Sequence, residues 1–430
     1  MDDTGNVAGG AATDDEVAAA RHLLTAAAVR ERCRLVAGLV EEGRSPRFRM
    51  RRERLADARD RVVALIRSRF PDLSVPLHSR WRHFEAGDVD RWSQLAAVRG
   101  WASAGEAARA AADLAILSVL VDAGAGPDWR YVEGATGETY ARSEGLAVAS
   151  LAMFAAGLFS GVPADPLRVD AGALEALSAD ELAAGFQAGP DNPLVGLTGR
   201  RDLLVRLAAA IRARPDIFAV ADDPRPGGIV DYLAEQASGG TLPATAILSA
   251  VLDGLGPIWP GRIELGGVSL GDAWRHPDLA GLVAAAGGPA AGADIVPFHK
   301  LSQWLSYSLV EPLGLLGIAV VDLDGLTGLA EYRNGGLFLD TGAIELVDPA
   351  DATRPLPVDD PVVVEWRALT VALLDDLAPM VRQAIGATSA TLPLCAILEG
   401  GTWLAGRTIA RERRADGGPP LVIVSDGTVF

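Results

Sequence analysis

Apolar residues recur at helical spacing along most of the chain. The spacing of Leu35, Val36, Leu39 and Val40 predicts a helical region over residues 16–70. Residues 105–122 form an Ala-rich amphipathic stretch, and residues 171–220 and 228–256 continue in the same pattern, interrupted by prolines. A further helix is predicted after residue 365, where its apolar stripe consists of Trp366, Leu369, Leu373, Leu377 and Met380.

Strand-like alternation is confined to two late segments, residues 337–347 and 421–424. A doubly wound sheet requires strands and helices that alternate regularly, and this chain lacks that pattern. The sequence therefore predicts a mainly α fold with a minor β component.

The predicted organisation is one compact body with a short leading tail. Residues 1–16 are acidic and rich in Gly and Ala, which is typical of a disordered tail. Residues 17–290 form a helical region, and a Gly/Ala-rich loop over 284–293 marks its end. Residues 291–430 form a second helical region, which contains the short strands and most of the candidate site.

Charge and composition narrow the function. The 430 residues carry a net charge of -17, which argues against a nucleic-acid binder because such proteins present a basic face. There is neither a signal-peptide pattern nor an apolar run of membrane-spanning length, so we expect a cytoplasmic protein without a membrane partner. Cys33 and Cys395 and five scattered His residues show no ligand spacing, so we expect no metal site and no cofactor.

Lys300 is the only lysine among 39 basic residues. On a helix, Lys300, Gln303, Tyr307 and Glu311 lie on one face, opposite an apolar face. Such a face is often merely solvated, but Gln and Tyr beside the only Lys are also consistent with the wall of a pocket.

Two further segments combine carboxylates with guanidinium groups. Glu331-Tyr332-Arg333 precedes two glycines, which let a backbone approach a ligand, although a surface ion pair would have the same sequence. Glu365-Trp366-Arg367 starts the late helix, where a Glu can also simply complement the helix dipole. With Lys300, these groups suit an anionic sugar phosphate that undergoes acid–base chemistry.

Residues 401–408 match G-x-x-x-x-G-R-T and so approximate a phosphate-binding P-loop. Arg407 stands where a P-loop requires Lys, and Trp403 is awkward inside such a loop. We expect a closely packed Gly-rich turn here, or one that binds phosphate through backbone N–H groups, and no nucleotide hydrolysis.

Eight segments spread over residues 20–430 resemble the uracil-catabolism family of fungi and bacteria, of the Urc-four and Urg-three type, long described as a domain of unknown function. They are residues 80–84, 122–131, 142–145, 298–303, 331–336, 365–367, 398–403 and 425–430. The resemblance implies a role in a route of uracil breakdown in which uracil becomes its nucleotide, the ring opens, and ribosylurea-type intermediates follow.

Three of these segments are also similar, in order and spacing, to signature segments of the queuosine salvage proteins. They are Phe298-x-Lys300-x-x-Gln303, Glu331-Tyr332-Arg333 and Glu365-x-Arg367. This likeness implies a helical body related to DNA glycosylases and hydrolysis of an N-glycosidic bond. The salvage proteins have Asp-Tyr-Arg where this chain has Glu331, and Val-Pro-Gln where it has residues 334–336, which fits a smaller ligand.

Taken together, these resemblances imply an N-ribosyl hydrolase that converts a ribosylurea 5′-phosphate to ribose 5-phosphate and urea. A carboxylate, Glu331 first and Glu365 second, would stabilise a cation-like ribosyl centre, and His83 or Glu365 would protonate the leaving urea. The expected substrate-binding residues are Lys300, Gln303, Arg333, Arg367, Tyr332, Arg82 and Arg142. Lys300 with Arg333 or Arg367 would hold the phosphate, and Gln303 or His83 would bind urea or ribose hydroxyls.

Two other functions stay open at this point. The protein could be an amidohydrolase that cleaves the opened ureide elsewhere, which ammonia release would reveal. It could also be a nucleotide sensor that binds without turnover. The sequence does not give the oligomeric state.

Overall fold

The computed structural model describes residues 12–122, 124–221, 223–259 and 263–424. The end of the sequence, residues 425–430, and most of the acidic tail therefore lie outside the described residues. The first helix, α1 (Asp14–Leu23), begins with a capping box between Thr13 and Glu16, two residues before the predicted end of the tail.

Helices account for most of the described chain. They are α1 (Asp14–Leu23), α2 (Ala26–Glu41), α3 (Leu55–Arg69), α4 (Trp81–Phe84), α5 (Arg91–Arg99), α6 (Ala104–Leu120), α7 (Arg142–Ala155), α8 (Ala171–Ala176), α9 (Ala179–Gly185), α10 (Leu197–Ala213), α11 (Pro215–Phe218), α12 (Ile229–Gln236), α13 (Ala244–Leu255), α14 (Leu279–Ala285), α15 (Lys300–Ser308), α16 (Val310–Leu315), α17 (Tyr332–Asp340), α18 (Pro361–Ile385), α19 (Leu394–Ile397) and α20 (Trp403–Arg413). A π-helical turn, η6 (Leu398–Thr402), joins α19 to α20.

Short strands pair only in twos within the described residues. The antiparallel pairs are β1 (Phe48–Met50) with β12 (Ile344–Leu346), β2 (Tyr131–Val132) with β3 (Thr139–Tyr140), β4 (Ala219–Val220) with β5 (Asp223–Pro224), β7 (Glu264–Leu265) with β8 (Val268–Ser269), and β9 (Ala273–Arg275) with β10 (Ile295–Pro297). The parallel pairs are β6 (Thr241–Pro243) with β11 (Ala319–Val321), and β13 (Leu356–Pro357) with β14 (Ile423–Val424).

The predicted fold class, mainly α with a minor β component, is confirmed. The strand expected over residues 337–347 is correct only at its end, because α17 occupies the chain as far as Asp340 and β12 begins at Ile344. Gly335 lowers intrinsic helix propensity, but its missing side chain lets α17 pack against Trp366, where a Cβ would come within 2.7 Å of the indole.

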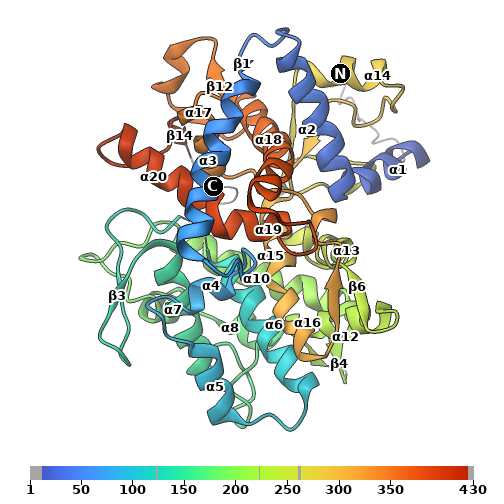
Figure 1. Cartoon of the computed structure of the whole chain (residues 1–430). Coiled ribbons are helices and arrows are strands. Elements are labelled where there is room, and N and C mark those ends of the chain that lie inside the picture. The colour runs from blue at the N-terminus through green and yellow to red at the C-terminus, as the bar shows by residue number, and fades with distance from the viewer. Residues whose placement is uncertain (1–11, 123, 222, 260–262, 425–430) are drawn as a thin grey trace, which may run out of the picture.

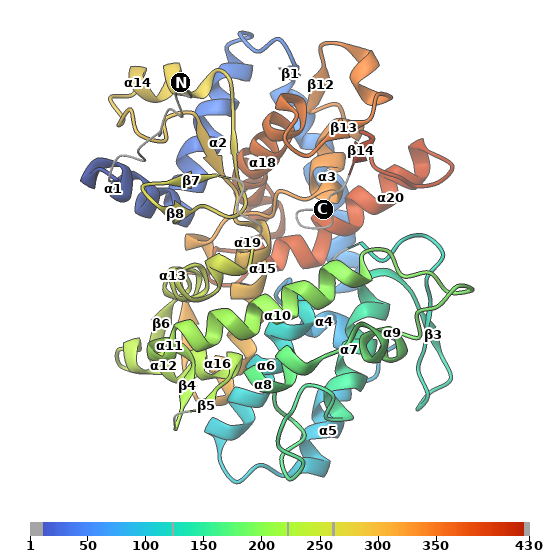
Figure 2. The ribbon, with the colours of Figure 1, turned by 180° about the vertical axis from the view of Figure 1, so that it is seen from behind.

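The two ends of the chain pack together, as Figures 1 and 2 show. Helices α2 and α3 lie against α18, and α3 also contacts α20 and η6. The middle of the chain forms a second group around α6 and α7, which α15 and α16 join. Both groups belong to a continuous apolar core, so segments far apart in sequence meet where the groups join.

Helices α6, α7 and α18 form the centre of this core. Residues 110–120 of α6 are all buried, as are residues 145–151 of α7. Ser103 caps the amino end of α6 and Asp360 caps that of α18, so these long helices begin at residues whose oxygens accept backbone N–H groups. None of the helices in the described part of the chain is long and apolar enough to cross a membrane.

Candidate functional site

A cavity of about 410 Å³ lies at the junction of the two groups of helices. Its lining comes from eight segments of the chain: the loop before α4, α4 itself, the loop after α6, the amino-terminal parts of α7, α15, α17 and α20, and the loop after α20. The lining residues are His78, His83, Asp122, Gly124, Ala125, Gly126, Pro127, Arg142, Ser143, Glu144, Lys300, Leu301, Trp304, Leu329, Glu331, Tyr332, Arg333, Trp403, Arg407, Asp416, Gly417, Gly418 and Pro419.

Two residues at the cavity are held in left-handed backbone conformation. Arg142 has φ 54°, and His299, which precedes Lys300, has φ 47°. For a residue with a Cβ this costs roughly 1–2 kcal/mol, so the surrounding structure must enforce it. At His299 the ring Nε2 bonds the carbonyl of Leu23 at 2.8 Å, which fixes the turn that places Lys300 at the start of α15.

Glu331 is the N-cap of α17 and faces the cavity. Its two carboxylate oxygens accept the backbone N–H groups of Arg333 at 2.7 Å and of Asn334 at 2.5 Å. Burial raises the pKa of Glu331 above its ordinary value, although the two N–H donors and the nearby Lys300 oppose this. Two backbone N–H groups thus fix a carboxylate in the wall of the cavity.

Lys300 lies close to this carboxylate. Burial lowers the pKa of Lys300, and the charge of Arg367 adds to the effect, while Glu331, Asp272 and Asp122 oppose it. Lys300 is therefore an ammonium group among carboxylates, positioned to contact either an anionic ligand or the ligand's polar hydroxyls.

His83 lines the cavity as a neutral imidazole. Its Nδ1 faces the guanidinium of Arg80 at 3.1 Å; since Arg can only donate, Nδ1 accepts and the proton resides on Nε2. Burial lowers the pKa of His83 well below its ordinary value, and the charges of Arg80, His78 and Arg82 act in the same direction. This geometry favours a hydrogen-bonding role for His83 over the predicted role as proton donor.

His78 has the opposite electrostatic environment. Its Nδ1 bonds Glu399 of η6 at 2.8 Å. Burial favours the neutral form of Glu399, but the hydrogen bond and charge of His78, with Arg69, hold the pKa of that carboxyl below its ordinary value. Trp304 lies beside the His78 ring at 6.3 Å between centroids. The bond to Glu399 leaves Nε2 of His78 as the ring nitrogen that can contact a ligand in the cavity.

Three arginines from different helices gather on another part of the wall: Arg142, Arg333 and Arg407. Arg333 donates to the carbonyl of Gly417 at 2.9 Å, and Gly406 lets α20 approach the backbone of Arg333, where a Cβ would come within 2.0 Å of the carbonyl oxygen. The Gly-rich segment around Gly401 likewise packs closely, against Val62 of α3. The expectation of a closely packed turn at this segment agrees with these contacts.

Of the residues predicted from sequence, the structure brings Lys300, Glu331, Tyr332, Arg333, Arg142 and His83 together around the cavity. Gln303 and Arg367 lie behind its wall. Gln303 is fully buried. Its side-chain N–H donates to the hydroxyl of Thr327 and its side-chain oxygen accepts the backbone N–H of Thr327, which fixes the loop before Glu331. Arg367 forms a two-point ion pair with Asp272 at 2.8 Å, and Asp272 also accepts the backbone N–H of Lys300 at 3.0 Å. Arg82 pairs with Glu85 at 2.8 Å.

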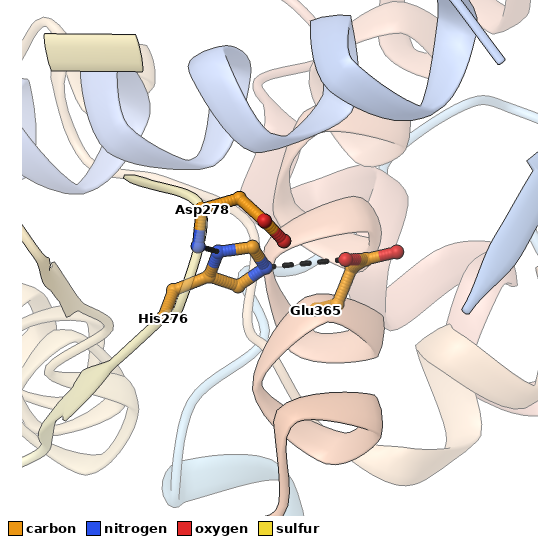
Figure 3. A group of neighbouring side chains, drawn as sticks. All are labelled: His276, Asp278 and Glu365. Atoms are coloured by element: carbon orange, nitrogen blue, oxygen red, sulfur yellow. Dashed lines mark hydrogen bonds and ion pairs between the residues drawn. The ribbon is translucent and has the colours of Figure 1, made fainter. Parts of the chain in front are cut away.

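Glu365 is not brought to the cavity. Figure 3 shows it beside His276 and Asp278, and the His276 Nε2 lies 3.1 Å from the carboxylate. Arg47 donates to both acidic groups, Glu365 at 2.7 Å and Asp278 at close range, and Ser45 donates to Glu365 at 2.5 Å. The guanidinium group of Arg47 supplies the positive charge in this cluster. The cluster joins α18 to the segment before β1 and to the segment before α14.

Several lining residues were not predicted from sequence: His78, Asp122, Trp304, Trp403, Arg407 and Asp416. Trp304 directly follows the segment 298–303, and Arg407 was considered only as a mismatch to a P-loop. Asp122 stands in a segment that the family resemblance had already marked, which was the available signal for it.

The fold and the cavity define a mainly α-helical protein with a highly charged cavity where the helices of the two chain ends meet those of the middle of the chain. The chain belongs to the family described as "Protein of unknown function (DUF1688)", which it matches over residues 22–430. It is 39% identical over 434 residues to "Uracil catabolism protein 4" of Lachancea kluyveri, covering 94% of this chain and 97% of the relative. It is also 41% identical over 387 residues to "Protein urg3" of Schizosaccharomyces pombe, covering 88% of this chain and 90% of that relative. The family resemblance inferred from the motifs is thereby confirmed, while the likeness to queuosine salvage proteins stays a prediction.

Proposed function

We propose that this protein acts in uracil catabolism as an N-ribosyl hydrolase that converts a ribosylurea 5′-phosphate to ribose 5-phosphate and urea. The role in uracil catabolism is supported by the name of the Lachancea kluyveri relative, "Uracil catabolism protein 4", and by the extent of the match. The observation that carries the reaction is Glu331, a carboxylate fixed by two backbone N–H groups in the wall of the cavity.

In the proposed reaction the bond between ribose C1′ and the urea nitrogen breaks, and its electron pair goes to the nitrogen. Glu331 stabilises the positive charge that develops at C1′, because a fixed negative charge in an enclosed site needs no rearrangement as the charge forms. Water then forms the new bond to C1′ and gives up one proton, which Glu331 accepts.

Urea is a poor leaving group unless its nitrogen is protonated as the bond breaks. We assign this proton to Nε2 of His78, because His78 lines the cavity and its other ring nitrogen is held by Glu399. The proton that Glu331 takes from water replaces, through solvent, the one that His78 gives. His83 offers an Nε2–H donor, and Lys300 an ammonium group, to the urea oxygen or the ribose hydroxyls.

The test is incubation of the purified protein with ribosylurea 5′-phosphate, followed by separate measurement of urea, ammonia and ribose 5-phosphate. Equal amounts of urea and ribose 5-phosphate are expected, with no ammonia. Ammonia in place of urea would identify an amidohydrolase instead. Binding of ribosylurea 5′-phosphate without release of urea or ammonia would identify a non-catalytic sensor instead.

A further inference from the structure

Arg142, Arg333 and Arg407 place three guanidinium groups on one wall of the cavity, although each comes from a different helix. Burial lowers the pKa of Arg407; Glu144 opposes this, while the charges of Arg411, Arg142 and Arg333 add to it. Guanidinium groups stay charged at any physiological pH, so this crowding is a repulsion that the fold maintains without neutralising it.

Two of these arginines have hydrogen-bond donors without a protein acceptor. Among the described residues, the Nε atoms of Arg333 and Arg407 are buried and have no hydrogen-bond partner. Arg333 is only 6% exposed, and its NH1 is already committed to the carbonyl of Gly417. An unsatisfied buried donor on a charged group costs about 1–3 kcal/mol or more, so an acceptor from a ligand would relieve a real penalty.

The neighbouring carboxylates do not cancel this charge. Glu144 is 3.8 Å from Arg407, longer than a direct hydrogen bond, and Asp416 uses one oxygen to accept the N–H of Gly418 at 2.9 Å. Helix α7, which is 14 residues long, begins at Arg142 without a side-chain cap, so the positive end of its dipole adds to the same wall.

We infer that Arg142, Arg333, Arg407 and the amino end of α7 form a binding site for a phosphomonoester dianion. The inference rests on the proposed function for the ribosyl part of the ligand. The phosphate would then bind not at Lys300, which lies beside Glu331, but at the wall that Arg142, Arg333 and Arg407 form, here called the arginine wall. The first turn of α17 carries both Glu331 and Arg333, so the helix that binds the phosphate also orients the carboxylate toward the sugar.

Calorimetric titration with ribose 5-phosphate and with inorganic phosphate tests the site in wild type and four variants. Arg407→Gln and Arg142→Gln each remove one charge-assisted contact and are expected to weaken binding of both ligands about 10- to 100-fold. Arg413→Gln is the matched control, because Arg413 is, like Arg407, an arginine of α20, but is exposed and lies outside the cavity lining. This variant should bind both ligands as wild type does. Lys300→Met should leave binding of inorganic phosphate within about threefold of wild type, because the site places Lys300 at the ribosyl part of the ligand and not at the phosphate.

Three results would overturn the site: no binding of either ligand to wild type, wild-type binding by both cavity arginine variants, or a loss confined to Lys300→Met. Urea release from ribosylurea 5′-phosphate separates this proposal from the proposed function. If wild type releases no urea but phosphate binding depends on Arg407 and Arg142, the reaction is wrong and the phosphate site stands. If urea is released and Arg407→Gln leaves KM unchanged, the reaction stands and the phosphate site is wrong.

Discussion

Replacement of Glu331 by Gln separates a catalytic carboxylate from a helix cap. The amide keeps the size of the side chain but has one oxygen in place of two, so it can accept only one of the N–H groups of Arg333 and Asn334. Losing one such bond costs about 1–3 kcal/mol of stability, and removing a buried charge offsets part of that cost. A loss of this size lowers Tm by only a few degrees in a chain of this length.

The expected effect on catalysis is much larger. If the charge of Glu331 stabilises the cation-like ribosyl centre, kcat should fall by about 10²- to 10⁴-fold, which corresponds to roughly 3–5 kcal/mol of barrier. Affinity for ribose 5-phosphate should change little, because the arginine wall is untouched. Burial raises the pKa of Glu331, so the acid limb of wild-type kcat/KM should lie above the range of an exposed glutamate.

The assay is urea release from ribosylurea 5′-phosphate between pH 4 and 9, with melting curves for each protein. Glu181→Gln is the matched control, because Glu181 also accepts a backbone N–H group at a helix start, that of Ser178, but is exposed and outside the cavity lining. A Glu331→Gln enzyme with kcat within about threefold of wild type would refute the reasoning and reduce Glu331 to a cap.

Two other predictions concern groups near the cavity. Burial raises the pKa of Glu311 from 4.5 to about 7, so folding favours its protonated form, and this stabilisation is complete below pH 4.5 and lost as pH rises through 7. Tm of wild type should therefore fall relative to Glu311→Gln between pH 5 and 8, and parallel Tm curves would contradict the assignment. Arg367→Ala should destabilise the protein by about 3–5 kcal/mol in urea unfolding, because it leaves Asp272 buried without its partner. Asp272→Asn combined with Arg367→Ala should recover part of that loss; full additivity of the two would show that the pair does not interact.

The helical fold was predictable because periodic apolar positions determine which face of each helix is buried. Helix α17 was harder, since Gly335 and Gly336 lower local propensity and the helix depends on its cap, Glu331, and on packing against Trp366. Local sequence does not reveal such tertiary contacts.

For the site, segments rich in polar residues revealed Lys300, Glu331 and Arg333, because clustered charges stand out from a core pattern. The same signal identified Arg367 and Gln303, which the fold uses as internal supports for the loop and helix ends at the cavity. His78 and Arg407 were missed as site residues because each is a single side chain, and only the packing of η6 and α20 brings them to the cavity.

The packing of α2 and α3 against α18 and α20 has a consequence for synthesis of the protein in the cell. About 320 residues separate Glu41, at the end of α2, from Pro361, at the start of α18. At roughly 5–20 residues per second, a ribosome needs about 15–60 seconds to make the partner of α2. During that time the apolar face of α2, which includes Val29, Cys33 and Val36, lacks the part of its native cover that α18 supplies, although β10 and α14 supply another part once they have been made. The nascent chain therefore offers chaperones an extended window of binding, and the ligand cavity can be completed only after the last helices leave the ribosome.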